Sequence, residues 1–260
     1  ARRLAMLREM GLRLLPPLQA PPSAPETTDA PAAVRVSAQP QRMQPPNRPP
    51  SNGDDGSGEE AVAREGAADL ASLGWDELRA AARDFATRDG SSRRVVFGVG
   101  PQRADWMVIG EAPGEAEEQQ GEPFAGPVGK LLDGMLRAMG LEPARDVYVT
   151  NLLKCRPPGD RNPDPEELAA WEPFLRREVA LVRPRMLLVM GRFAVPRLLR
   201  TQEPIGRLRG RAHAYDGVPV VVTYHPAYLL RNLPDKAKAW ADLCLAQDLL
   251  AGDQAPASGR

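Results

Sequence analysis

The sequence predicts an α/β fold with a parallel sheet and helices on both of its faces. Four short apolar runs have the length and composition of buried strands, and each is followed by a helical pattern or by a loop rich in polar and charged residues. Strands that alternate with helices favour parallel pairing, because the crossover helices then cover both faces of the sheet.

The expected strands are 106–109, 147–150, 186–190 and 218–223. Apolar residues spaced three and four apart predict helices near 128–139, 165–182, 192–200 and 235–250, and one or two more across 70–85. Pro165, with acidic residues directly after it, is typical of a helix start. Asp216 and Gly217 predict a hairpin turn before the last strand, and 93–100 is expected to be a short edge strand or a loop.

The first quarter of the chain has a composition that does not favour folding. Proline pairs and a run rich in Ser, Gly and Asp predict a disordered linker at 16–66, because this segment cannot bury enough apolar surface to offset its ordering entropy. Residues 1–15 form a short amphipathic segment, which is either a peptide that docks on a replication or repair protein or a frayed terminus. We expect the folded domain at 67–251 and a flexible tail at 252–260.

Composition narrows the class of protein. The two cysteines, Cys155 and Cys244, exclude a disulfide scaffold and fit a reducing cytoplasm. No apolar run approaches the roughly 20 residues of a membrane span, so we expect no membrane contact. The net charge is zero, so any DNA binding must depend on a local basic patch. We expect a cytoplasmic, nucleoid-associated monomer.

The stretch 108–129 is the most informative part of the sequence. A predicted strand ends at Gly110, and the loop after it contains further glycines, prolines and carboxylates around one large aromatic side chain, Phe124. Ligands bind to open α/β sheets at the carboxyl ends of the strands, and glycine lets the backbone approach a ligand closely. The stretch is therefore either a site where Phe124 stacks on a flat ring or an ordinary connection with an acidic surface.

Polar side chains also follow the second and fourth predicted strands. In a parallel sheet these loops emerge at the same edge as the first, which brings together an acid, an amide, an aromatic ring and a histidine: Glu111, Asn151, Phe124 and His225. An amide beside a histidine can recognise the donors and acceptors of a nucleobase, and nearby basic residues can bind phosphates. Taken singly, a turn-forming Asn151 and a capped core His225 are the simpler interpretations. The spacing of histidines and cysteines does not match a zinc site.

Four segments resemble the motifs of family 4 uracil-DNA glycosylases: 110–126, 150–158, 161–163 and 225–231. The resemblance extends from about residue 78 to residue 250. It implies a three-layer α/β/α sandwich with a central four-stranded parallel sheet. It also implies an enzyme that flips uracil out of DNA and hydrolyses its N-glycosidic bond, which initiates base-excision repair.

The resemblance also implies roles for the pocket residues. Phe124 would stack on the extruded uracil, Asn151 would pair with its N3 and O4 edge, and His225 would stabilise negative charge on O2. Glu111 would position or activate water, and Glu117 would lie near C5 and exclude the methyl group of thymine. The rest of the pocket would be formed by Gly110, Ala112, Pro113 and Gly114.

By the same resemblance, the loop after the last strand would enter the DNA groove. Pro226 begins this loop, Leu229 or Leu230 would fill the vacated position in the base stack, and Arg231 would bind a phosphate. The basic residues expected at the rim of the site are Lys154, Arg156 and Arg161.

The cysteines depart from the family pattern. Family 4 enzymes hold a four-iron four-sulfur cluster on four cysteines, whereas here only Cys155 stands at a cluster position and Trp171 takes the place of the last one. A single thiolate cannot hold such a cluster. The sequence therefore predicts no cofactor and no metal, with Phe85 and Trp171 filling the space. The alternative function is a non-catalytic DNA-binding or replisome accessory protein built on the glycosylase fold.

Overall fold

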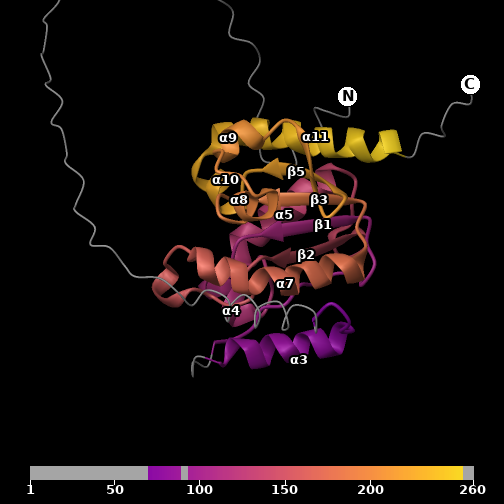
Figure 1. The fold of residues 1–260 in the computed structure, drawn as a ribbon. Coiled ribbons are helices and arrows are strands. Elements are labelled where there is room, and N and C mark those ends of the chain that lie inside the picture. The colour runs from indigo at the N-terminus through magenta and orange to yellow at the C-terminus, as the bar shows by residue number, and fades with distance from the viewer. Residues whose placement is uncertain (1–69, 89–92, 254–260) are drawn as a thin grey trace, which may run out of the picture.

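The computed structural model describes residues 70–88 and 93–253 (Figure 1). The predictions for 1–15 and 16–66, for most of the tail at 252–260 and for the first residues of 67–251 lie outside these residues. Where the domain begins and ends therefore stays a prediction.

The described residues form strands β1 (Trp106–Gly110), β2 (Val147–Asn151), β3 (Met186–Met190), β4 (Ala212–Tyr215) and β5 (Val218–Thr223). The longer helices are α3 (Trp75–Ala86), α5 (Gly126–Ala138), α7 (Pro165–Val182) and α11 (Lys236–Asp253). The shorter ones are α4 (Glu115–Gln120), α6 (Pro143–Asp146), α8 (Ala194–Leu199), α9 (Ile205–Leu208), α10 (Pro226–Arg231) and the single 3-10 turns η1 (Pro158–Asp160) and η2 (Leu233–Asp235).

One sheet organises the fold, with strand order β2-β1-β3-β5-β4. The first four strands in this order pair in parallel, whereas β4 pairs antiparallel with β5. The predicted α/β class and the four parallel strands are confirmed. The fifth strand arises because Asp216 and Gly217 both adopt positive φ, at 46° and 83°, which suits a tight hairpin turn.

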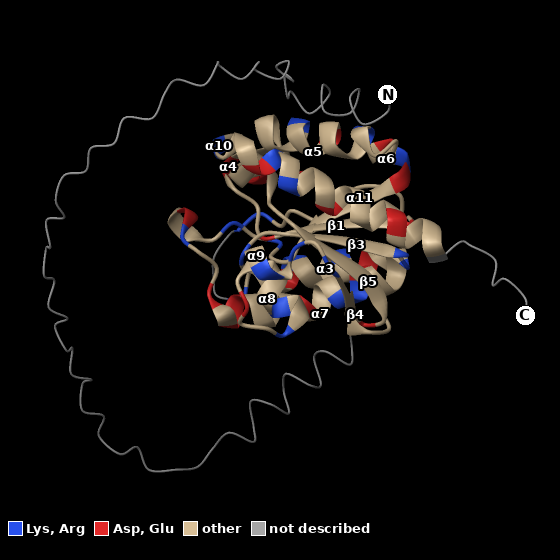
Figure 2. Ribbon diagram, turned by 90° about the horizontal axis from the view of Figure 1, so that it is seen from above, with Lys and Arg blue, Asp and Glu red and all other residues tan. Residues whose placement is uncertain are grey.

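Helices cover both faces of the sheet, so the molecule has three layers (Figure 2). Along β1, Met107 and Ile109 belong to the core beneath α3, α7 and α8, whereas Trp106 and Val108 belong to the core beneath α5 and α11. Alternate side chains of a strand point to opposite faces, and strands buried on both faces are expected to be apolar throughout. All five residues of β1 are buried.

Helix α7 starts as the sequence predicts. Asp164 is its N-cap residue, and the backbone N–H of Asp164 donates to the carboxylate of Glu167 at 3.1 Å. Pro165 occupies the first turn, where a missing N–H costs nothing. Further along the same helix, Glu178 has no exposed surface.

Other segments differ in detail from the predictions. The predicted helix at 192–200 begins only at Ala194. Residues 93–100 form a loop, one of the two predicted alternatives, with one isolated bridge between Val99 and Val149. The loops after β1 and β5 contain the short helices α4 and α10. In the part of the chain that the structure describes, no helix combines the length and the apolar composition needed to cross a bilayer.

Candidate active site

The loops after β1 and β2 are hydrogen-bonded to each other at the carboxyl edge of the sheet. The backbone N–H of Leu152 donates to the carbonyl of Gly110 at 3.1 Å, and that of Leu153 donates to the carbonyl of Glu111 at 2.9 Å. The strand register also places Gly110 opposite Asn151. Glu111 in the first loop and Asn151 in the second are therefore attached to main-chain segments that are hydrogen-bonded to each other.

Gly110 lies where two predicted site residues meet. A Cβ atom at this position would lie 2.2 Å from Oδ1 of Asn151 and 2.6 Å from Cζ of Phe124. Such distances are far inside van der Waals contact, so only glycine lets both side chains approach the end of β1. The structure thus brings Asn151 and Phe124 to the same point.

The carboxamide of Asn151 has a fixed orientation. Its Nδ2 donates to the carbonyl oxygen of Pro123 at 2.9 Å, and a carbonyl can only accept. The Oδ1 atom therefore faces the other way, where it is buried without a hydrogen-bond partner in the described structure. A buried unpaired acceptor costs about 1–3 kcal/mol, so this atom is poised to accept a hydrogen bond from a ligand.

His225 is the N-cap residue of α10, and its ring stacks on Phe124. The ring centroids are 5.2 Å apart, at an interplanar angle of 21°. The Nδ1 atom accepts a hydrogen bond from the backbone N–H of Ala227 at 3.2 Å. Burial, and then the positive charge of Arg231, lower the pKa of His225 to about 4. The imidazole is therefore neutral near pH 7, with its proton on Nε2.

Glu111 is held against the loop that follows β3. Its Oε1 accepts a hydrogen bond from the backbone N–H of Phe193 at 2.6 Å. Burial raises the pKa of Glu111, whereas the hydrogen bond from Phe193 and the charge of Arg192 oppose this rise. Gly191 has φ of 108°, and a Cβ there would lie 2.3 Å from Cγ of Glu111. Gly191 therefore makes room for the carboxylate.

A cleft of about 660 Å³ opens beside Glu111 and His225. Its walls include predicted pocket or DNA-contact residues, namely Ala112, Pro113, Gly114, Arg161 and Arg231, and residues that the sequence reasoning missed, namely Arg192, Phe193, Tyr224 and Tyr228. The sequence did contain one indication that the loop after β3 belongs to the site: Gly191 directly follows a buried strand of the parallel sheet.

Phe124 and Asn151 do not line this cleft. Phe124 borders a second cleft, of about 920 Å³, which runs along α5, and Asn151 borders neither. Phe124 contacts the cleft wall through the ring of His225. Because these two rings touch, a base cannot lie between them unless they separate.

Glu117 links the two ends of the loop that carries Phe124. Its Oε1 accepts from the backbone N–H of Ala125 at 3.1 Å, and its Oε2 accepts from that of Gly114 at 3.2 Å. Ala125 directly follows Phe124, so the hydrogen bond to Glu117 holds the main chain next to Phe124 in place. Contact between Glu117 and the C5 atom of a base stays a prediction.

The prediction that Lys154 contacts DNA is wrong. Its side chain has no exposed surface, because its ammonium group forms an ion pair with the equally buried Glu178. Arg156 retains 23% exposure but pairs with Asp160 and Glu118. Both carboxylates compete with any phosphate for that guanidinium. The sequence could not show these acidic partners.

The segment 226–231 is divided between core and surface. Pro226 is buried and Leu229 is 0% exposed, so the prediction that either contacts DNA is contradicted. Leu230 is 39% exposed, and Arg231 is exposed and lines the cleft. Arg161 also lines the cleft, although Glu167 accepts its hydrogen bonds at 2.8 Å.

The position of the family's cluster lies in an aromatic part of the core. The rings of Phe85 and Trp171 pack edge to face with centroids 4.8 Å apart, and Phe174 packs on both. Cys155 is buried in the same core. Among residues 70–88 and 93–253, no group of three or more His, Cys, Asp or Glu side chains could hold a metal ion.

The chain is similar to several curated type-4 uracil-DNA glycosylases. It is 40% identical to the enzyme of Saccharolobus solfataricus over 55% of this chain and 69% of that protein. It is 41% identical to the enzyme of Archaeoglobus fulgidus over 52% of this chain and 71% of that protein. With the enzyme of Pyrobaculum aerophilum it shares 34% identity over 59% of this chain and 82% of that protein.

This similarity corrects the prediction that the protein has no cofactor. The relatives belong to the type-4 class, whose members are iron–sulfur cluster enzymes, and this contradicts the prediction. The two cysteines of this chain do not match a four-thiolate donor set. The cofactor of the relatives therefore disagrees with the cysteines present in this chain, and whether this chain carries a cofactor is unresolved. No chemical step below depends on one.

The family comparison covers the whole sheet. The model of the uracil DNA glycosylase superfamily matches residues 97–244, which include β1 to β5 and every loop that contributes to the site. This match, the relatives and the α/β/α architecture agree with one another. The chain belongs to the uracil DNA glycosylase superfamily.

Proposed function

We propose that this protein is a uracil-DNA glycosylase that flips uracil out of DNA and hydrolyses its N-glycosidic bond, the first step of base-excision repair. The similarity to named uracil-DNA glycosylases supports the general activity. One structural observation supports the choice of base: the unpaired Oδ1 of Asn151 lies beside the Phe124 ring, which in turn contacts His225.

The fixed carboxamide of Asn151 suits uracil better than cytosine. Its Oδ1 can accept from N3–H of uracil, and the second proton on Nδ2 can donate to O4. Cytosine presents an unprotonated N3 and an exocyclic amine. Its N3 acceptor would then face the acceptor Oδ1, and its amine donor would face the donor Nδ2. Mispaired buried polar groups cost several kcal/mol in total (about 1–3 for each), and Pro123 prevents the amide from turning over.

The neutral His225 is suited to assist departure of the base. When the glycosidic bond breaks, negative charge develops on O2 of uracil. The Nε2–H of His225 can donate to this oxygen, because Nδ1 already accepts from Ala227. A fixed donor aimed at developing charge in a partly dry site is an effective form of catalysis.

Glu111 supplies a negative charge on the wall of the same cleft. In its ionised form it can orient a water molecule for attack on the sugar and stabilise positive charge on C1′. Arg192 and the N–H of Phe193 favour that ionised form against the effect of burial. Glu111 is thus the candidate for activating the water.

The surroundings of the cleft support a monofunctional enzyme. An enzyme that also cuts the DNA strand commonly needs an amine nucleophile, and no lysine appears among the cleft-lining residues that the structure describes. Leu230 is exposed, which supports a role in filling the gap left by a flipped base. Arg231 is exposed and lines the cleft, which supports a role in binding a flanking phosphate.

An oligonucleotide assay tests the proposal. A duplex with one uracil is incubated with the protein, and alkali then cleaves any abasic site. We expect wild type to give strand cleavage and His225→Ala to give far less. The matched control His213→Ala should cleave as well as wild type. His213 lies on β4, where Nε2 contacts the carbonyl of Leu208. A wild-type protein that binds DNA but releases no uracil would instead support an accessory role.

A further inference from the structure

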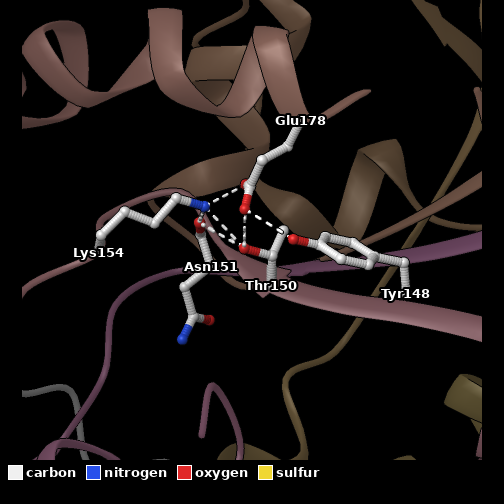
Figure 3. A network of polar contacts seen from close by, with 5 residues as sticks. All are labelled: Tyr148, Thr150, Asn151, Lys154 and Glu178. Atoms are coloured by element: carbon white, nitrogen blue, oxygen red, sulfur yellow. Dashed lines mark hydrogen bonds and ion pairs between the residues drawn. The ribbon is translucent and has the colours of Figure 1, made fainter. Parts of the chain in front are cut away.

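A buried polar network lies directly behind Asn151 (Figure 3). The Nζ atom of Lys154 donates to Oγ1 of Thr150 and to the main-chain carbonyl oxygen of Asn151, each at 2.7 Å, and forms an ion pair with Glu178. The carboxylate of Glu178 also accepts from the hydroxyl of Tyr148 at 3.0 Å and from that of Thr150 at 3.1 Å.

Stability alone does not account for this network. The side chains of Lys154 and Glu178 are both 0% exposed. Removing two charges from water is costly, and replacing a buried ion pair with well-packed hydrophobic residues of similar volume is often neutral or stabilising. Neither residue lines the cleft. The hydrogen bond from Lys154 to the main chain of Asn151, a proposed site residue, is therefore the feature that remains to be explained.

The network restrains the main chain at the end of β2. Lys154 holds the carbonyl of Asn151, and the next N–H, that of Leu152, donates to the carbonyl of Gly110. The peptide group after Asn151 is thus fixed on both of its sides. In Figure 3 the carboxamide of Asn151 points away from Lys154 and Glu178. A fixed peptide therefore sets the direction in which this side chain projects.

We propose that Lys154 and Glu178 are positioning residues for Asn151: they hold its main chain so that the carboxamide meets the base edge at the correct distance and angle. This inference rests on the proposed function of Asn151 in recognising uracil. A charged donor suits this position because its hydrogen bond to a carbonyl is stronger than that of a neutral donor. A shift of about 1 Å in a recognition group is enough to slow an enzyme on the order of a hundredfold.

The test replaces the pair without leaving an unpaired charge. In the double variant Lys154→Met/Glu178→Gln, methionine has a similar length to lysine, and glutamine can still accept from Tyr148 and Thr150. We expect the melting temperature to fall modestly, because the carbonyl of Asn151 and the hydroxyl of Thr150 lose the donor Lys154, and the affinity for DNA to stay close to wild type. We expect uracil release in a single turnover to slow by about tenfold to a hundredfold.

A double-mutant cycle separates positioning from a general structural effect. In an Asn151→Ala background, the same double replacement should cause no further slowing, because the side chain being positioned is gone. The matched control is Glu172→Gln/Arg197→Met, which removes another ion pair of α7 and should leave the rate unchanged in both backgrounds. Equal slowing by Lys154→Met/Glu178→Gln with and without the Asn151 side chain would overturn the proposal.

A second measurement does not depend on catalysis. Amide hydrogen exchange reports the N–H of Leu152, whose bond to Gly110 fixes the same peptide group. We expect its exchange to be about tenfold faster in Lys154→Met/Glu178→Gln, and unchanged in the control. Unchanged exchange would overturn the positioning role. If wild type releases no uracil, the proposed function fails, whereas the exchange result still decides whether Lys154 and Glu178 position this peptide.

Discussion

The Nδ2 atom of Asn151 lies 2.9 Å from the carbonyl oxygen of Pro123, the residue directly before Phe124. This hydrogen bond joins the group that would recognise the base edge to the loop that carries the stacking ring. The loop that carries the ring therefore also holds the amide in its orientation. Under the proposed function, base choice would depend on the bond between these two loops as well as on the identity of the residues.

Replacement of Gly110 tests the meeting point of those loops. In Gly110→Ala, the new methyl group would lie 2.2 Å from Oδ1 of Asn151 and 2.6 Å from Cζ of Phe124, so both must move. We expect a loss of about 1–3 kcal/mol in the free energy of unfolding and a fall in uracil release on the order of a hundredfold. The control is Gly206→Ala, because a Cβ at Gly206 meets nothing within 4 Å. Full activity of Gly110→Ala would argue against a shared pocket.

The pH dependence of the single-turnover rate tests Glu111. Burial raises the pKa of Glu111 above its ordinary value of 4.5, so activity should fall on acidification with a midpoint above 4.5. Loss of the positive charge in Arg192→Gln should move that midpoint higher, and Arg103→Gln, at an exposed arginine outside the cleft, should not move it. If Glu111→Gln shows the same acidic fall as wild type, another group is responsible.

His225 makes the stability of the fold depend on pH. Burial lowers its pKa from 6.5 to about 4, so the unfolded chain binds more protons than the folded one between these values. The contribution of the neutral ring is fully present above pH 6.5 and is lost as the pH falls through about 4. Denaturant unfolding at several pH values should show this loss in wild type and a smaller one in His225→Gln. An equal loss in both proteins would contradict the assignment.

Leu230 is expected to matter most when the base must leave a duplex. Leu230→Ala removes the exposed side chain that would occupy the vacated stack, and unstacking costs a few kcal/mol. Uracil release from double-stranded DNA should therefore slow more than release from single strands. Leu233→Ala, at a more exposed leucine in η2, is the matched control. Equal slowing on both substrates would place Leu230 outside the flipping step.

Glu117→Ala tests whether this carboxylate acts through the loop or on the base. Its loss removes two hydrogen bonds, from Gly114 and Ala125, that hold the Phe124 loop. We expect slower release of uracil, by about tenfold, with no release of thymine. Measurable thymine release would show that Glu117 also borders C5 of the base.

The strands were predictable because strong local signals determine them. The apolar runs of β3 and β5 have the bounds expected from the sequence, and β1 and β2 each extend one residue further. Those extra residues are Gly110 and Asn151, which belong to the strands because parallel pairing continues to the edge of the sheet. Apolar periodicity cannot show this, since neither residue is a large apolar one.

Lys154 shows why part of the site could not be predicted. A lysine in a polar loop is usually exposed, and only tertiary packing brings Glu178, which is far along the chain, to bury and neutralise it. Leu229 and Leu230 were equivalent in the sequence, and helix α10 turns one into the core and the other to the surface. Arg192 was missed because the importance of its loop comes from contact with Glu111, a residue of another loop.

The most direct test of the account compares uracil and cytosine at one position of the same duplex, with wild type and Asn151→Asp under single-turnover conditions. Gln102→Glu, at an exposed amide outside the cleft, controls for the change of charge. We predict that wild type releases uracil and no cytosine, and that Asn151→Asp releases uracil about a hundredfold more slowly and gains release of cytosine. Unchanged release of uracil by Asn151→Asp, with no cytosine released, would contradict the claim that Asn151 selects the base.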